Sequence, residues 1–254
     1  MINNLFQADT GDQTGIGVVA PFDFALDREL WRWIPHHVTL HTTRLPYLPD
    51  PVTVRLAAAL GNPHGVRRAT RDVLVPEPSV VAYACTSGSF VDGSSGEAAL
   101  VAGMLDAGAP AAVTTSGALV RACDALGVRR LAVITPYVDE VTDRLVRFLA
   151  EHGIRTCSSL GLGLLGGIWK TTYAQVVAAA AEMDLTGADA LFVSCTNVPT
   201  YDLIGPLEAR LGIPVITANQ VTMWAALRLA GVTGAAAQRL FDAGEDLAPT
   251  EIGA

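Results

Sequence analysis

Eight short runs of apolar residues alternate with longer segments of helical character along this 254-residue chain. The runs are nearly continuous in apolar residues, which is typical of parallel strands that are covered on both faces. They span residues 15–20, 38–43, 80–84, 111–114, 131–135, 155–160, 190–194 and 214–217. Helices, many followed by glycine as at helix C-termini, are expected over 53–61, 63–73, 94–107, 117–126, 138–151, 172–183, 201–211, 219–229 and 233–243. This alternation predicts an α/β fold with doubly wound parallel sheets.

The two halves of the chain share landmarks. AYACTSGSF and then AAVTTSGALVRACDALGV in the first half correspond to LFVSCTNVPTY and then IPVITANQVTMWAALRLAGV in the second. Cys85 and Cys195 are 110 residues apart, and Thr114 and Thr217 are 103 residues apart. An internal repeat of this kind predicts two similar, pseudo-symmetric lobes. We expect one lobe to comprise residues 1–116 and 219–254 and to carry Cys85, and the other to comprise residues 117–218 and to carry Cys195.

Composition excludes several classes of protein. Half of the residues are hydrophobic and only 17% are charged, which excludes a disordered chain. The net charge of −8 comes without a basic stripe, so we expect no nucleic-acid partner. The four cysteines form no CxxC pair and the five histidines lack metal-ligand spacing, so neither a disulfide scaffold nor a metal site is expected. Residues 1–15 show no signal pattern and no apolar run could span a bilayer, so we expect a cytoplasmic protein without a membrane partner.

Two of the cysteines stand where a predicted strand ends and a loop leads to a helix, namely Cys85 and Cys195. Ligands of open α/β sheets bind at this edge, and backbone N–H groups there lower the pKa of a thiol. A free cysteine is often a small buried core residue, and this is our interpretation of Cys123 and Cys157, which lie inside a predicted helix and a predicted strand. Because Cys85 and Cys195 are equivalent in the two halves, we expect a catalytic pair that works on opposite faces of one carbon.

Polar residues follow both of these cysteines: Thr86 and Ser87 after the first, Thr196 and Asn197 after the second. With the backbone N–H groups at helix starts, such residues can hold a carboxylate without any Arg or Lys. Helix capping is the alternative role, and both roles stay open for Thr115 and Ser116. Tyr137 ends a further predicted strand, where its hydroxyl can reach the same carboxylate, although a surface position is an equal alternative.

Several motifs together resemble the aspartate/glutamate racemase superfamily, above all its maleate isomerase and arylmalonate decarboxylase branch. They are IGVVAP (16–21), CTSGSF (85–90), GVRRLAVITPYVDEVTDRLVRFLAEHGI (127–154), SCTNVPTYD (194–202) and LGIPVIT (211–217). The resemblance implies two pseudo-symmetric lobes with the active site between them, and no cofactor. It also implies that a retained carboxylate is held by Thr86, Ser87 and Tyr137 with the backbone at Cys195 and Thr196. Racemases and maleate isomerases of this type carry a cysteine in each lobe, whereas the decarboxylases keep only that of the second lobe.

The end of the first predicted strand departs from the maleate isomerases. They have Ser-Ser-Asn after the proline, whereas this chain has Phe-Asp-Phe at 22–24, which argues against maleate as the substrate and favours a less polar or larger acid. Pro21 and Phe22 are expected to line the pocket together with Asn197. The sequence GLGLLGG at 161–167 lacks the setting of a dinucleotide site, so we expect a loop over the pocket.

We therefore expect a cofactor-independent isomerase or racemase that acts next to the carboxylate of a small carboxylic or dicarboxylic acid. Cys85 would be its nucleophile and Cys195 the partner acid/base. The alternative is an arylmalonate-type decarboxylase in which Cys195 protonates an enediolate; Phe22 and Phe24 favour it, and the presence of Cys85 does not. A non-catalytic two-lobed binding protein is a third hypothesis. Whether the protein forms a homo-oligomer stays open. The apolar segment 176–181 can belong either to the core or to a dimer interface.

Overall fold

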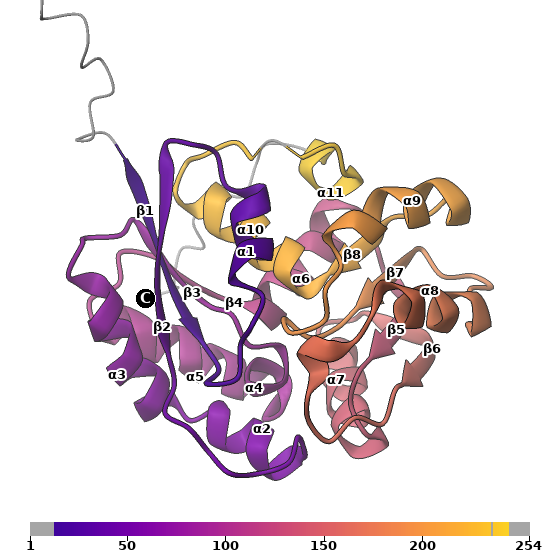
Figure 1. Cartoon of the computed structure of the whole chain (residues 1–254), viewed down its shortest axis with the longest axis horizontal. Helices are drawn as coiled ribbons and strands as arrows, with labels where there is room; N and C mark the ends of the chain where they lie inside the picture. The colour runs from indigo at the N-terminus through magenta and orange to yellow at the C-terminus, as the bar shows by residue number, and fades with distance from the viewer. Residues whose placement is uncertain (1–12, 235, 244–254) are drawn as a thin grey trace, which may run out of the picture.

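Two four-stranded parallel sheets form the fold in the computed structural model, which describes residues 13–234 and 236–243 (Figure 1). The strand orders are β2-β1-β3-β4 and β6-β5-β7-β8, so the second sheet repeats the topology of the first. The strands are β1 (Thr14–Ala20), β2 (Val38–Arg44), β3 (Val80–Tyr83), β4 (Ala112–Thr114), β5 (Arg130–Thr135), β6 (Arg155–Gly161), β7 (Ala190–Val193) and β8 (Val215–Thr217). The predicted two-lobed, doubly wound α/β fold is confirmed.

Helices cover the sheets in the order that the alternation predicts. They are α1 (Asp27–Leu30), α2 (Val54–Leu60), α3 (Pro63–Leu74), α4 (Thr86–Phe90), α5 (Gly93–Asp106), α6 (Thr115–Ala125), α7 (Asp139–Glu151), α8 (Tyr173–Glu182), α9 (Tyr201–Leu211), α10 (Ala218–Leu229) and α11 (Arg239–Asp242), with 3-10 turns η2 (Trp31–Trp33) and η3 (Ile168–Lys170). The short helices α1 and α4 were not predicted, because four or five residues are too few to show a helical period.

The helix predicted over 233–243 is wrong, since only α11 is helical within the described part of that range. A Cβ atom on Gly234 would lie 2.4 Å from Cε1 of Phe241. Residues seven apart in a continuous helix would be separated by about 10 Å along the axis. The chain therefore folds back between these two residues instead of continuing as a helix.

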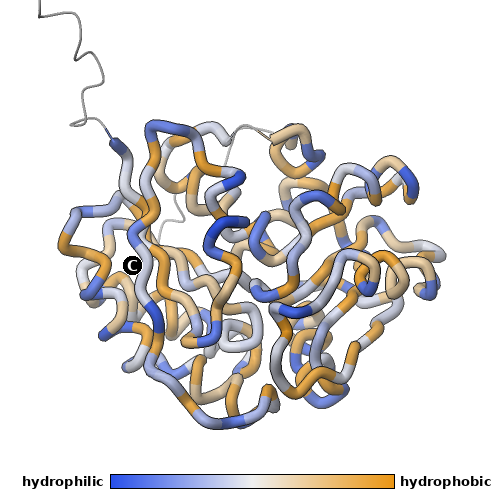
Figure 2. Tube along the Cα trace, in the orientation of Figure 1, coloured by the Kyte–Doolittle hydropathy of each residue, from blue (hydrophilic) through white to orange (hydrophobic). Residues whose placement is uncertain are grey.

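Burial explains why the strands could be predicted from the sequence. Every residue of β3 and β7 is buried, whereas the edge strands β2 and β6 are partly exposed along their length. In Figure 2 the hydrophobic segments accordingly follow the inner strands and the helix faces that cover them. Central parallel strands have both faces covered, and this produces the continuous apolar runs.

Helices α6 and α10 pack against each other. The hydroxyls of Thr115 and Thr222 join these helices at 2.8 Å. Helix α10 contacts β3 and β4 of the first sheet and β8 of the second. The division into a lobe of residues 1–116 and 219–254 and a lobe of residues 117–218 stays a prediction, and residues 1–12, 235 and 244–254 lie outside the described residues.

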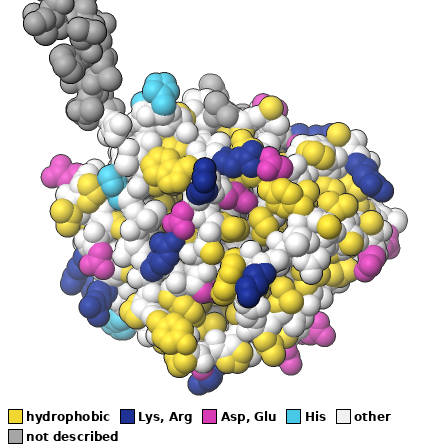
Figure 3. Space-filling view, in the orientation of Figure 1, with side chains coloured by type: hydrophobic (Ala, Val, Ile, Leu, Met, Phe, Trp, Pro, Cys, Tyr) yellow, Lys and Arg dark blue, Asp and Glu magenta, His cyan; other side chains and the backbone are white. Residues whose placement is uncertain are grey.

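The surface and the helix lengths bear on two further expectations. Figure 3 shows one face on which side chains of both charges are scattered among hydrophobic and polar ones, with no continuous basic stripe. Within the described residues no helix combines the length and the apolar character that crossing a membrane requires. In α8, Val176, Ala179 and Ala180 are buried, so this part of the segment belongs to the core.

Candidate active site

The central strands of both sheets end at one pocket. Pro21 follows β1, Cys85 lies two residues after β3, Tyr137 two residues after β5, and Cys195 two residues after β7. All four line the same pocket, which has about 410 Å³ of atom-free space including its opening to solvent. The carboxyl ends of central parallel strands are the expected place for a ligand, and here the ends of two sheets face a single space.

Cys85 begins helix α4 and is only 2% exposed. Its sulfur packs against Gly88, where an added Cβ would lie 3.0 Å from Sγ and 2.6 Å from the hydroxyl oxygen of Tyr83. Burial raises the pKa of Cys85 to about 11, even though the Tyr83 hydroxyl and the Gly88 N–H act in the opposite direction. The thiol is therefore protonated at neutral pH.

Cys195 has φ +84°, in the left-handed region that residues other than glycine rarely adopt. Such strained residues persist only where the surrounding structure fixes them, and they cluster at functional sites. The backbone N–H of Asn197 points to Sγ at 3.5 Å. Burial raises the pKa of Cys195 to about 12, against the lowering effect of the Tyr137 hydroxyl and this N–H.

An acidic side chain also lines the pocket. The carboxylate of Asp23 raises the pKa of both Cys85 and Cys195, as a minor cause after burial. Burial in turn raises the pKa of Asp23 itself. Neither Lys nor Arg is among the described residues that line the pocket. Any carboxylate bound there must therefore be held by neutral donors.

The buried hydroxyl of Thr86, next to Cys85, has no hydrogen-bond partner among the described residues, whereas the Tyr137 hydroxyl lies within reach of the Cys195 thiol and the Ser194 hydroxyl. A buried hydroxyl without a partner is costly and calls for an explanation. Burial, and then the neighbouring Cys195, raise the pKa of Tyr137 well above its usual value of 10, so it remains a hydrogen-bond donor. Ser87 lines the pocket as well. These neutral hydroxyls are the kind of donor set that a carboxylate needs in a site without Arg or Lys.

Thr196 and Asn197 line the pocket, but their side chains join loops of the protein. The hydroxyl of Thr196 donates to the carbonyl oxygen of Ala84 at 3.2 Å. The side-chain amide of Asn197 accepts from Ala25 N at 2.9 Å and donates to the carbonyl oxygen of Asp23 at 3.1 Å. The side chain of Thr196 is thus engaged within the protein, which leaves its backbone N–H for a ligand.

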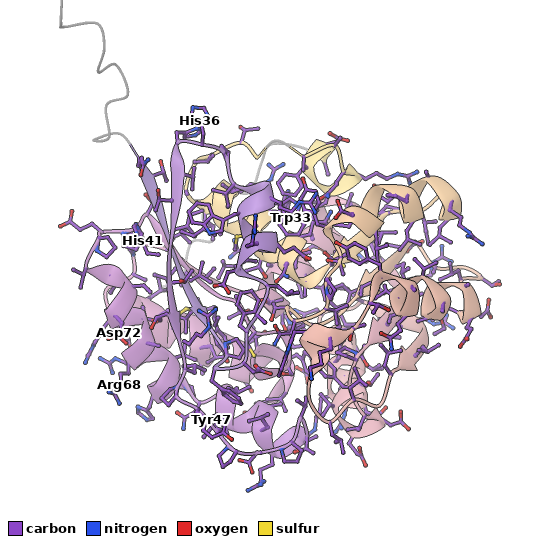
Figure 4. All side chains as sticks on the ribbon, in the orientation of Figure 1. Trp33, His36, His41, Tyr47, Arg68 and Asp72 are labelled. Carbon is purple, nitrogen blue, oxygen red and sulfur yellow. The ribbon has the colours of Figure 1, made fainter. Side chains whose placement is uncertain are left out.

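Two of the residues predicted for the site lie beside the pocket lining. Phe22 packs edge-on against Tyr47, with ring centroids 5.3 Å apart, and Figure 4 shows Tyr47 at the outer edge of the molecule. Thr86 is buried next to Cys85 without lining the pocket itself. Ser116, for which two roles were open, bonds to Ser89 at 2.6 Å between α6 and α4. Its hydroxyl therefore joins two helices.

One wall of the pocket was not predicted from the sequence; it is apolar and consists of Val52, Leu56, Ala57, Leu60 and Ile168. Three of these residues lie on one face of α2, at a spacing that also describes an ordinary core face. No signal in the sequence distinguishes the two, because the difference depends on what faces the helix in space.

The glycine-rich loop 162–167, which we call the strap, lies beside the pocket. Its Gly163 N–H donates to the carbonyl oxygen of Tyr137 at 3.1 Å, and the Val52 N–H of the other lobe donates to its Leu165 carbonyl oxygen at 2.9 Å. At Gly161, just before the strap, a Cβ would lie 2.7 Å from the carbonyl oxygen of Tyr137. Backbone contacts thus hold the strap to both lobes beside the pocket.

No group of three or more His, Cys, Asp or Glu side chains that could bind a metal ion is found in the described part of the chain.

Residues 65–241 match the sequence model of a protein family described as arylmalonate decarboxylase. The arylmalonate decarboxylase of Bordetella bronchiseptica is 37% identical over 172 residues, which cover 65% of this chain and 71% of that protein.

Solved structures of both enzymes of the branch are similar to this fold. A liganded double mutant of arylmalonate decarboxylase has a TM-score of 0.82 and 30% identity, covering 91% of this chain and 99% of its own. A mutant of Nocardia farcinica maleate cis-trans isomerase with a covalently bound succinylcysteine intermediate has a TM-score of 0.80 and 26% identity, covering 90% and 98%.

Proposed function

The chain belongs to the arylmalonate decarboxylase family, and from that premise we propose that it is a cofactor-independent isomerase or racemase acting next to a carboxylate. The observation that carries the proposal is that Cys85 and Cys195 line one pocket from two sheets. The resemblance found in the sequence to this branch is confirmed by the family match. A role as a non-catalytic binding protein is not favoured, because the similar proteins are enzymes.

In the isomerase version, the Cys85 thiolate adds to a C=C bond conjugated to the carboxylate. The π electrons move into an enediolate, which the Cys195 thiol protonates at carbon. Rotation about the new single bond follows; the Cys195 thiolate then removes the proton and the C–S bond breaks, releasing the other isomer and the Cys85 thiolate. The covalent succinylcysteine of the similar maleate isomerase supports addition of a cysteine to such a bond.

In the racemase version, one thiolate removes the α-proton and the other thiol delivers a proton to the opposite face. Each version needs one thiol and one thiolate, which titrate as a coupled pair. Burial favours the neutral form of both in the free protein. The Gly88 N–H at Cys85 and the Asn197 N–H at Cys195 stabilise whichever thiolate forms.

The substrate carboxylate would be held by the hydroxyls of Thr86, Ser87 and Tyr137, with the backbone at Cys195 and Thr196. The unpartnered hydroxyl of Thr86 and the protonated hydroxyl of Tyr137 support this assignment. The rest of the substrate would face the apolar wall of α2 and Ile168, which favours an apolar substituent over a second carboxylate. Maleate is for this reason not the substrate that we favour.

Decarboxylation of a malonate-type diacid is the second candidate, and the same apolar wall favours it. A carboxylate without hydrogen-bond donors is destabilised in apolar surroundings. Its C–C bond would break with release of CO₂, the electron pair would form an enediolate, and Cys195 would protonate it. Cys85 has no role in that reaction.

Incubation in D₂O with maleate, single-enantiomer α-substituted acids and aryl- or alkylmalonates, followed by NMR, separates these reactions. α-Deuteration with loss of optical activity supports the racemase, and a trans acid from a cis acid supports the isomerase. A monodeuterated monoacid with CO₂ supports the decarboxylase.

Cysteine variants test the role of each thiol in that assay. We expect C85S to lose about 100-fold or more of isomerase or racemase turnover, and C195S to lose turnover in every version. C157S is the matched control, because Cys157 is a half-buried cysteine that does not line the pocket. Full isomerase or racemase turnover by C85S would show that the two-thiol mechanism is wrong.

A further inference from the structure

A buried acid outside the pocket receives an unusual set of hydrogen bonds. Glu29 of α1 is 8% exposed, and its carboxylate lies between α9 and α10. Oε2 accepts from the backbone N–H of Thr200 at 3.0 Å, and Oε1 accepts from the Thr200 hydroxyl at 3.0 Å and from Asn219 Nδ2 at 3.2 Å. The backbone N–H of Tyr201 is a further donor to this carboxylate. Four donors thus converge on one side chain.

Thr200 lies at the end of the loop that carries the second cysteine, and Asn219 is hydrogen-bonded to the same loop. This segment, residues 194–200, is called the Cys195 loop. Asn219 Nδ2 also donates to the carbonyl oxygen of Thr196 at 2.9 Å, directly after the cysteine. Glu29 therefore holds the Cys195 loop at Thr200 directly and at Thr196 through Asn219.

A strained residue needs this kind of support. Cys195 keeps φ +84°, and a backbone in that region relaxes when the structure around it loosens. We propose that Glu29 is a positioning residue, whose carboxylate fixes the Cys195 loop so that the Cys195 thiol stays in the pocket. The effect of Glu29 on turnover rests on the proposed function, whereas its effect on the position of the Cys195 thiol does not.

The geometry requires a carboxylate at this position. Glutamate offers two oxygens that accept all four hydrogen bonds. Glutamine keeps one oxygen and turns an NH₂ group toward N–H donors, so at least one buried donor loses its partner. Aspartate keeps both oxygens on a side chain that is one methylene shorter and should restore part of the effect.

Glu208 provides a matched control. It is a buried glutamate with 6% exposure, and its oxygens accept from Val215 N at 3.1 Å and Arg239 N at 3.4 Å. It does not line the pocket or bond to the Cys195 loop. E208Q therefore removes the same charge from a similar environment without affecting the thiols.

The experiment measures iodoacetamide alkylation of each cysteine by mass spectrometry at pH 8 in wild type, E29Q, E29D and E208Q. In E29Q the relaxed loop exposes Cys195 and lowers its pKa, so its alkylation should become about tenfold faster for each unit of pKa lost. The alkylation rate of Cys85 should change by less than about twofold, which corresponds to a pKa change of about 0.3 unit. E29D should fall between wild type and E29Q, and E208Q should match wild type.

A second variant covers the case in which E29Q does not fold. N219A removes the link to Thr196 and leaves both Thr200 hydrogen bonds in place. Unchanged Cys195 alkylation in the folded variants, or an equal rise in E208Q, would overturn the proposal. If E29Q accelerates Cys195 alkylation while wild type converts no acid, the positioning role stands and the proposed function fails. If both hold, E29Q should lower kcat more than it changes KM.

Discussion

The hydroxyl of Thr196, one residue after Cys195, donates a hydrogen bond to the carbonyl oxygen of Ala84, one residue before Cys85, at 3.2 Å. These residues are 112 positions apart in the chain and belong to loops that follow different sheets. The bond is buried, so water does not compete for it. It joins the two thiol-bearing loops directly and thereby fixes the separation of the two sulfurs.

Replacement of Thr196 by valine tests this link. T196V keeps the shape of the side chain but leaves the buried Ala84 carbonyl without its donor, which should cost about 1–3 kcal/mol of the free energy of unfolding. A small shift between reacting groups also lowers turnover steeply, by about 100-fold per ångström. The control is T70V, because Thr70 is a buried threonine that donates to Val66 O at 2.8 Å within α3. Equal turnover in both variants would contradict the role of this bond.

The buried thiols should make the protein less stable at alkaline pH. Burial raises the pKa of Cys85 from 9.0 to about 11, so above pH 9 the unfolded chain releases a proton that the folded chain retains. The stabilising contribution is complete below pH 9 and is lost as the pH rises toward 11, by about 1.4 kcal/mol per pH unit. The free energies of unfolding of wild type and C85A, measured with urea between pH 8 and 10.5, should therefore converge as the pH rises. Parallel curves would show that the folded thiol titrates normally.

Removal of the charge on Asp23 should activate both thiols. The carboxylate raises the pKa of Cys85 and of Cys195, so D23N should lower both pKa values and accelerate alkylation of both cysteines at a fixed pH. The control is D72N, which removes a charge from the outer face of α3 (Figure 4). If both cysteines of D23N are alkylated no faster than those of D72N, an electrostatic effect of Asp23 on the thiols is excluded.

Alanine at position 88 should disturb Cys85 by contact alone. The added methyl would lie 2.6 Å from the Tyr83 hydroxyl and 3.0 Å from Cys85 Sγ, and overpacking of this kind costs about 1–3 kcal/mol. G65A is the matched control, because its new Cβ would meet no atom within 4 Å apart from its own neighbours in the helix. Alanine in the helix α3 should there add about 0.4–1 kcal/mol of stability. A crystal structure of G88A with Cys85 Sγ unmoved would refute the expectation.

Much of the fold was predictable because its central strands are buried on both faces. All eight predicted strands agree with the structure to within one residue at either end. Cys85 and Cys195 were expected at one pocket because each follows a predicted strand, and Tyr137, for which a surface position was an equal alternative, lines the same pocket. The helix over 233–243 failed, since Gly234 and Phe241 meet through a tertiary contact that no local pattern encodes.

The unpredicted parts of the site share one physical cause. The apolar wall of α2 has the spacing of a core face, and the carboxylate of Asp23 is one acid among many in the sequence. The hydroxyl of Thr196 was expected to be available to the ligand together with the backbone, yet this hydroxyl bonds to Ala84 in the other half of the chain. Each of these roles is set by a partner distant in sequence, which a single sequence does not reveal.

The left-handed backbone of Cys195 has a consequence for engineering this protein. Glycine adopts such a conformation without steric cost, so a selection for thermal stability alone would reward the loss of this cysteine. Thermostable variants should therefore be sought with position 195 held constant, because a library scored only by melting temperature will favour variants that lack the thiol proposed to act on the substrate.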